Sequence, residues 1–229
     1  YGLRWQIFSV ALGFILCAAA GWWLVSSFPD LAGLFASDSM VSNLEKGELW
    51  TDGLLNIVPS SVLSLQIFTN NISVALATVA LGVLYGLGTI YIIGLNGLML
   101  GAVFALTAQY GMAGELFDFV VAHGCVELSV IVIAGAAGFS VGESLARPGQ
   151  LSRSRAFQEA LRRATKLLVV CVLFLVGAGL IEGYVSPDPA FPREARIAIG
   201  VAYWLLLLAV LCGGRPSRFL SKPVTEDRR

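Results

Sequence analysis

The chain has 229 residues, of which 57% are hydrophobic and 13% are charged, and its fifteen basic and fifteen acidic side chains cancel. A soluble domain carries about 25% charged residues, so this composition excludes an ordinary soluble enzyme domain. A net charge of zero offers no electrostatic footprint for nucleic acid. The sequence therefore predicts a protein whose partner is the lipid bilayer, with no nucleic-acid partner.

Apolar windows predict an all-α polytopic membrane helix bundle that forms a single domain over 1–229. A spanning helix needs about 17 to 25 mostly apolar residues. Such windows predict six spans, at about 6–27, 72–92, 95–109, 126–145, 167–183 and 197–214. In the first window a signal peptide is the competing interpretation, but the apolar run continues through Val25, and Trp22 and Trp23 suit an interfacial anchor.

Charged segments between the windows predict the orientation. Lys and Arg accumulate in cytoplasmic loops, and both the segment 147–166 and the tail 215–229 are basic. The segment 29–65 carries five acidic residues against Lys46 alone, and its apolar residues recur at helical spacing. We therefore expect an extracytoplasmic amphipathic helix at 29–65, a basic cytoplasmic helix within 147–166 that begins at Ser152 or Ser154, and both termini in the cytoplasm.

Ionisable residues inside membrane segments are costly, and they are therefore candidates for function. No Lys or Arg occurs from Gly47 to Ala146, yet this stretch holds several carboxylates and the only histidine. His123 and Glu127 are four apart, which places them on one face of a helix. Glu115 and Asp118 precede them on a stretch too short to span.

Two interpretations of these four residues stay open. In one, residues 109–125 form a re-entrant half-helix, and the four side chains make an intramembrane polar site that binds a cation or a proton. In the other, Glu115 and Asp118 lie in an outer loop, Glu127 stabilises a helix start, and His123 is structural.

Other chemistry is not indicated. The four cysteines, Cys17, Cys125, Cys171 and Cys212, are far apart in apolar runs, which predicts neither disulfides nor a zinc site. One histidine with scattered carboxylates is no metal-ligand signature. No nucleotide-binding or hydrolase motif is present in the sequence, so we expect no catalytic residues, no cofactor, no metal and no enzymatic activity.

Small and amide residues predict how the helices pack. Buried amides bridge membrane helices, and glycines four apart let helix backbones approach closely. The candidates for bridging are Asn70, Asn71 and Asn96, and those for close packing are Gly82, Gly86, Gly97, Gly101, Gly138 and Gly142. Such glycines also make a homodimer or higher homo-oligomer an expectation.

An ordered set of these residues resembles the stage II sporulation protein M family. The set is Phe68-Thr69-Asn70-Asn71, then Gly82, Gly86 and Gly88, then Asn96-Gly97 with Gly101, then His123-Gly124 with Glu127-Leu128, and finally Gly135 and Gly138. The likeness spans 59–143 and departs from the family at Ala122, where proline is frequent. It implies a multipass prokaryotic inner-membrane protein without known enzymatic activity, whose named member is a scaffold for cell-wall-degrading partners.

Two functions therefore compete at the level of sequence. A scaffold that organises membrane or cell-envelope proteins agrees with the family and with the long outer segment. A channel or transporter that uses His123 and Glu127 to bind or pass cations, protons or a small solute agrees with the unpaired acidic core. The depth of Glu127 in the bilayer discriminates between the two.

Overall fold

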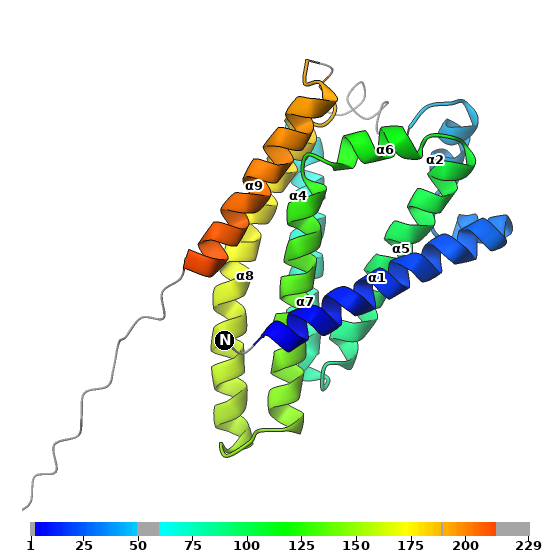
Figure 1. Cartoon of the computed structure of the whole chain (residues 1–229). Helices are drawn as coiled ribbons and strands as arrows, with labels where there is room; N and C mark the ends of the chain where they lie inside the picture. Colours follow the sequence, from blue (N-terminus) through cyan, green and yellow to red (C-terminus); the bar gives the residue numbers. More distant parts are fainter. Residues whose placement is uncertain (1–2, 50–59, 189, 214–229) are drawn as a thin grey trace, which may run out of the picture.

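The structure is a computed structural model that describes residues 3–49, 60–188 and 190–213. Its elements are α1 (Arg4–Ser27), η1 (Pro29–Leu34), α2 (Asp38–Glu45), α4 (Ser60–Ala80), η2 (Leu81–Val83), α5 (Leu87–Gln109), α6 (Ala113–Val120), α7 (Gly124–Ala146), α8 (Arg153–Tyr184) and α9 (Arg193–Gly213). These described ranges contain no strand. The all-α polytopic bundle is therefore confirmed (Figure 1).

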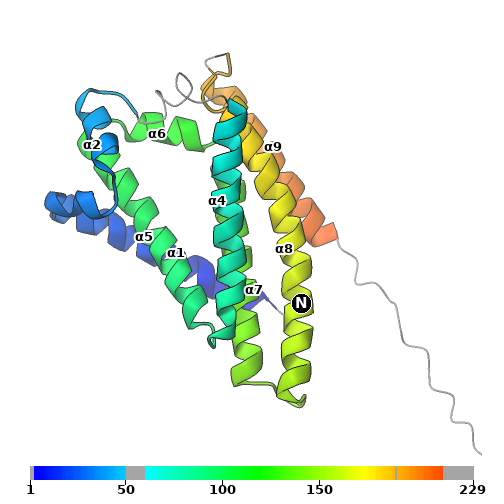
Figure 2. The same cartoon turned by 180° about the vertical axis from the view of Figure 1, so that it is seen from behind.

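Five helices are long and apolar enough to cross a membrane: α1, α5, α7, α8 and α9. The second predicted span, at about 72–92, overlaps α4 and η2, whose joint apolar part, Phe68–Val83, is shorter than these five helices. Because α4 packs lengthwise against α7 and α8 (Figure 2), it belongs to the same bundle. The count of six spans stays a prediction.

The predicted boundary between the second and third spans, at 92–95, is wrong. The chain turns earlier, between η2 and α5, and residues 87–109 form one uninterrupted helix. Tyr85 and Gly86 both take left-handed backbone conformations, with φ of 55° and 83°, which ends one helix and starts the next. The position of this turn could not be predicted from the sequence, because neither a proline nor a charged residue marks it.

Glycines make the closest helix contacts, as their spacing predicts. A Cβ on Gly138 of α7 would lie 2.5 Å from the carbonyl oxygen of Thr78, and one on Gly142 would meet the backbone nitrogen of Gly86. A Cβ on Gly97 of α5 would lie 2.6 Å from the carbonyl oxygen of Phe14 in α1. The glycines therefore join helices within one chain, and homo-oligomerisation stays a prediction.

Helix α8 combines the predicted basic helix and the fifth predicted span in one uninterrupted helix of 32 residues. Ser152 is its N-cap, and its hydroxyl accepts a hydrogen bond from the backbone N–H of Arg155 at 3.4 Å. The buried side chains of Ala156, Ala160 and Ala164 join the core formed with α7. The basic segment is therefore the start of a spanning helix rather than a separate helix on the membrane surface.

The end of the bundle opposite the turn between α7 and α8 is covered by non-spanning elements (Figure 1). Short helices η1 and α2 replace the single amphipathic helix expected at 29–65, and residues 60–65 belong to α4. Part of that expectation, 50–59, lies outside the described residues. Buried Ala32, Met40, Leu44 and Leu116 join η1, α2 and α6 to the ends of α1 and α5.

The region 109–125 is not re-entrant. Helix α6 runs crosswise from the end of α5 to the start of α7 and does not descend between the spans (Figures 1 and 2). A Cβ on Gly124 would lie 2.5 Å from the Val120 side chain, so a larger residue would have to displace that side chain where α6 turns into α7. The outer-loop interpretation of 109–125 is therefore the better one.

Candidate functional site

His123 and Glu127 lie together at the start of α7, as their spacing predicts. His123 is the N-cap residue, and its carbonyl oxygen accepts hydrogen bonds from the backbone N–H groups of Val126 and Glu127. His123 is 3% exposed. Glu127 lies in the first turn of α7, where the positive end of the helix dipole favours a carboxylate.

Three further side chains reach this pair from other elements. Asn71 of α4 donates a hydrogen bond from Nδ2 to Oε1 of Glu127 at 2.6 Å. Ser186, in the loop after α8, lies with Oγ 3.1 Å from Nδ1 of His123. Glu182, in the last turn of α8, places Oε2 at 3.7 Å from Nε2 of His123. The site therefore joins α4, α7 and α8 at the end of the bundle that α6 crosses.

The cluster of His123, Glu127 and Glu182 is compact. One ligand atom from each of the three lies within 4.8 Å of the other two. Oε2 of Glu182 is buried without a hydrogen-bond partner. Such an atom costs free energy unless a proton or a cation satisfies it.

The imidazole of His123 is held in one orientation. Phe119 of α6 contacts it edge to face, with ring centroids 5.7 Å apart. Burial lowers the pKa of His123 to about 3, because desolvation disfavours the charged imidazolium. The ring is therefore neutral, and the approach of Nε2 to Glu182 is a polar contact rather than an ion pair.

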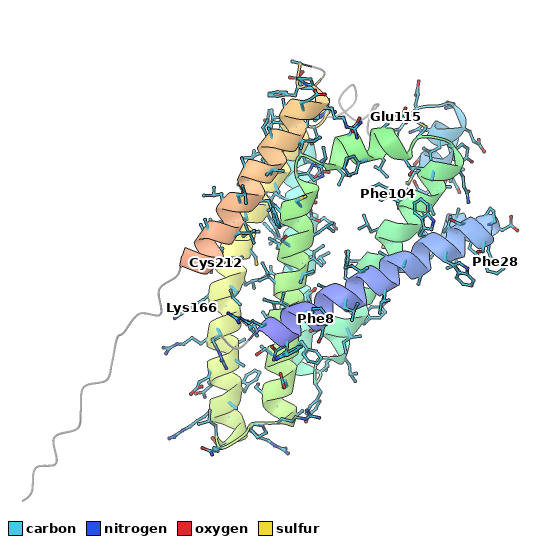
Figure 3. All side chains as sticks on the ribbon, in the orientation of Figure 1. Phe8, Phe28, Phe104, Glu115, Lys166 and Cys212 are labelled. Atoms are coloured by element: carbon cyan, nitrogen blue, oxygen red, sulfur yellow. The ribbon has the colours of Figure 1, made fainter. Side chains whose placement is uncertain are left out.

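Glu115 and Asp118, which the sequence groups with this site, lie apart from it. Glu115 is exposed on α6 (Figure 3). Asp118 pairs with Arg193 of α9, with Nε and Oδ1 3.0 Å apart. Glu115 therefore belongs to the exposed surface of α6, and Asp118 to the contact between α6 and α9.

Of the three amides predicted to bridge helices, one forms a bridge through a hydrogen bond within the described ranges and the other two do not. Asn71 bridges α4 and α7 through Glu127. Asn70 is exposed on α4, and Asn96 donates to the carbonyl oxygen of Ile92 in its own helix at 2.8 Å. Asn96 therefore contributes no bridge between helices through that bond, contrary to expectation.

Sequence reasoning missed Glu182. That residue interrupts the apolar run of α8 just before the helix ends, and it reads naturally as the boundary of a span. Glu182 is 59 positions from His123, so only the antiparallel packing of α7 and α8 brings them together. A carboxylate within an apolar run was the one available signal.

Beyond the cluster the helix interfaces become apolar. Along α7 toward the turn before α8, the buried side chains are Val130, Ile133, Ala134, Ala137 and Val141. Polar side chains recur near the other end of α7, where Gln6 donates a hydrogen bond from Nε2 to Glu143 at 2.8 Å. Among the described residues, an apolar core therefore separates the two polar groups.

The comparisons with known proteins give one match. No curated protein and no solved structure matches the chain. A family model described as stage II sporulation protein M matches residues 10–187. The match begins within α1, continues past the end of α8 and includes His123, Glu127, Glu182 and Ser186. The chain is a multipass membrane protein and belongs to the stage II sporulation protein M family.

Proposed function

We propose that this chain is a non-enzymatic membrane scaffold that docks membrane or cell-envelope proteins at its outer end. The observation that carries the proposal is the construction of that end from η1, α2 and α6, which do not span and share a core with the ends of α1 and α5. Such elements enlarge one end of the bundle without adding a path through it. A scaffold role also agrees with the family resemblance.

A polar hollow in this end is the best candidate for the docking point. It has a volume of about 470 Å³, and its lining includes Asp30, Asp38 and Glu45 beside Gln109 and Tyr110. Its carboxylates would attract a basic segment of a partner protein. The family resemblance supports an inner membrane of a prokaryote, and the positive-inside pattern supports an orientation with this hollow outside the cytoplasm and both termini inside it.

A photocrosslinking amino acid at Ser42, which lines the hollow, tests the proposal in the native host. We expect a discrete protein adduct that falls at least fivefold when Asp38→Asn and Glu45→Gln are introduced together. The matched control places the crosslinker at exposed Gln158, on the basic part of α8. Identical adducts at both positions, or adducts that ignore the two substitutions, would refute docking at this end.

A second candidate, transport of a cation, a proton or a small solute, is favoured by the buried cluster of His123, Glu127 and Glu182. Against it stands the apolar core between that cluster and Glu143, so a route would have to form between copies of the chain. The test is ion or proton flux in liposomes, with Glu127→Gln beside Glu143→Gln. Flux that Glu127→Gln abolishes would favour transport over the scaffold.

A further inference from the structure

We propose that His123, Glu127 and Glu182 form a binding site for one divalent transition-metal ion of the zinc type, which fastens the start of α7 to the end of α8. The inference is independent of the scaffold proposal, and it requires binding but no movement of ions. It departs from the sequence, which predicts no metal site, because the third ligand becomes apparent only in the folded chain.

The donor set suits such an ion. Zinc accepts imidazole nitrogen and carboxylate oxygen, and three protein ligands leave a fourth position for water. With bonds of about 2.0 to 2.2 Å, the ligand atoms of a tetrahedral zinc lie about 3.4 Å apart. Nε2 of His123 and Oε2 of Glu182 are already 3.7 Å apart, and the widest separation in the cluster is within 4.8 Å. Small side-chain rotations therefore bring all three atoms around one ion.

The hydrogen bonds around the cluster orient the ligands. In the tautomer in which Nδ1–H of His123 donates a hydrogen bond to Oγ of Ser186, 3.1 Å away, Nε2 carries the lone pair, and this lone pair faces Glu182. Asn71 holds Oε1 of Glu127 at 2.6 Å, which leaves the second oxygen for an ion. Ligating histidines and carboxylates commonly have such outer partners, so Asn71 and Ser186 are positioning residues.

The charge balance also favours a cation. Two carboxylates lie at the site, and within the described ranges neither forms a salt bridge with Lys or Arg. The arginines at the start of α9 contact other groups: Arg193 pairs with Asp118, and Nη2 of Arg196 donates to the carbonyl oxygen of Asp188, while Nε of Arg196 is buried without a hydrogen-bond partner. One divalent cation would neutralise both carboxylates and satisfy the orphaned Oε2 of Glu182.

Zinc binding to the whole purified chain in detergent tests the site. All samples carry Cys125→Ser, because the thiol of Cys125 is exposed two positions after His123. We expect one zinc ion per chain by elemental analysis, and at least tenfold weaker zinc binding, by competition with a chelating dye, in Glu127→Gln and Glu182→Gln. Ser186→Ala should weaken binding about tenfold, as losses of such outer partners do.

The matched control is Glu143→Gln. Glu143 lies in the same helix as Glu127 and also accepts a hydrogen bond from an amide side chain, that of Gln6. We expect the zinc affinity of the Glu143→Gln variant to stay within twofold of the zinc affinity of the parent chain. Equal zinc binding by all these variants would show adventitious binding and overturn the proposal.

A measurement on the Cys125→Ser chain, in which the three ligands are intact, guards against variants that fail to fold. His123 is the only histidine, so its carbethoxylation by diethylpyrocarbonate reports on one ring. We expect saturating Zn²⁺ to slow that reaction at least tenfold, whereas Mg²⁺ leaves it unchanged. A chain that binds no zinc and reacts at the same rate with zinc present overturns the proposal, and a proton shared by Glu127 and Glu182 would then balance the charge.

Discussion

Asn70 and Asn71 are neighbours in sequence and differ completely in their surroundings. The side chain of Asn71 reaches Glu127 of α7, whereas that of Asn70 is exposed on the surface of α4. Periodicity alone does not say which of two adjacent amides faces the bundle. The same limit applies to Glu115 and Glu127, which are both acidic residues next to apolar runs.

We therefore expect Asn71→Ala to destabilise the fold by about 0.6 to 1.7 kcal/mol, the range of hydrogen bonds between membrane helices. Asn70→Ala is the matched control and should change the free energy of unfolding by less than about 0.5 kcal/mol. Reversible unfolding in mixed detergent micelles measures both. Equal losses would mean that the bond to Glu127 contributes nothing.

At the turn between α4 and α5, substitutions at two adjacent residues are expected to change the stability of the fold in different directions. Gly86→Ala should destabilise by about 1 to 2 kcal/mol, because a Cβ is unfavourable at a left-handed residue. Tyr85→Gly should be neutral or stabilising, since Tyr85 is exposed and also left-handed. Thermal unfolding of both variants checks the pair, and a Tyr85→Gly loss as large as that of Gly86→Ala would contradict it.

At the scale of the helices, close approach depends on residues that the sequence identifies by spacing alone. Gly138 of α7 lies under the bond that Thr89 of α5 donates to the carbonyl oxygen of Thr78 at 2.8 Å. Three helices therefore meet where only a hydrogen atom fits. The spacing predicts small residues at a contact, but it does not identify the partner helix. The partner is set by the turn at residues 84–86, which neither proline nor a charged residue marks.

Gly138→Ala tests this contact. A Cβ there would lie 2.5 Å from the Thr78 oxygen and 2.6 Å from Oγ1 of Thr89, so we expect a destabilisation of about 1 to 3 kcal/mol from overpacking. Gly13→Ala in α1 is the control, because its Cβ meets nothing within 4 Å, and it should be neutral or stabilise by up to about 1 kcal/mol. Unfolding midpoints in one detergent compare the two. An unchanged unfolding midpoint in Gly138→Ala would show that α4 and α7 can move apart without loss of stability.

At the scale of the whole molecule, composition and span length predict the fold class, because apolar windows of about 20 residues match the length of a helix that crosses the bilayer with its backbone hydrogen bonds satisfied internally. The family resemblance likewise follows from an ordered set of residues. The complete site was not predictable, since Glu182 joins His123 only when α8 folds back along α7. The orientation in the membrane is a prediction from the charges alone.

Labelling of single cysteines in a background without the four natural ones tests that orientation. We expect Ser42→Cys in α2 to react with a membrane-impermeant maleimide in intact cells, because the acidic end faces outward. Gln158→Cys in α8 should react only after permeabilisation. The reverse pattern would place the acidic end in the cytoplasm and remove the basis for docking envelope partners.

The continuity of α8 sets how far each of its charges stands from the lipid. With a rise of about 1.5 Å per residue, Arg162 lies about 6 Å along the axis from Lys166, and Arg155 lies about 17 Å away. The Debye length is about 8 Å at physiological ionic strength. In the proposed orientation, Lys166, Arg163 and Arg162 are close enough to attract anionic headgroups, whereas Arg155 and Arg153 are screened from them. Because α8 is one uninterrupted helix, in this orientation the charges nearest Lys166 interact with the headgroups, and those at its start interact with the cytosol instead.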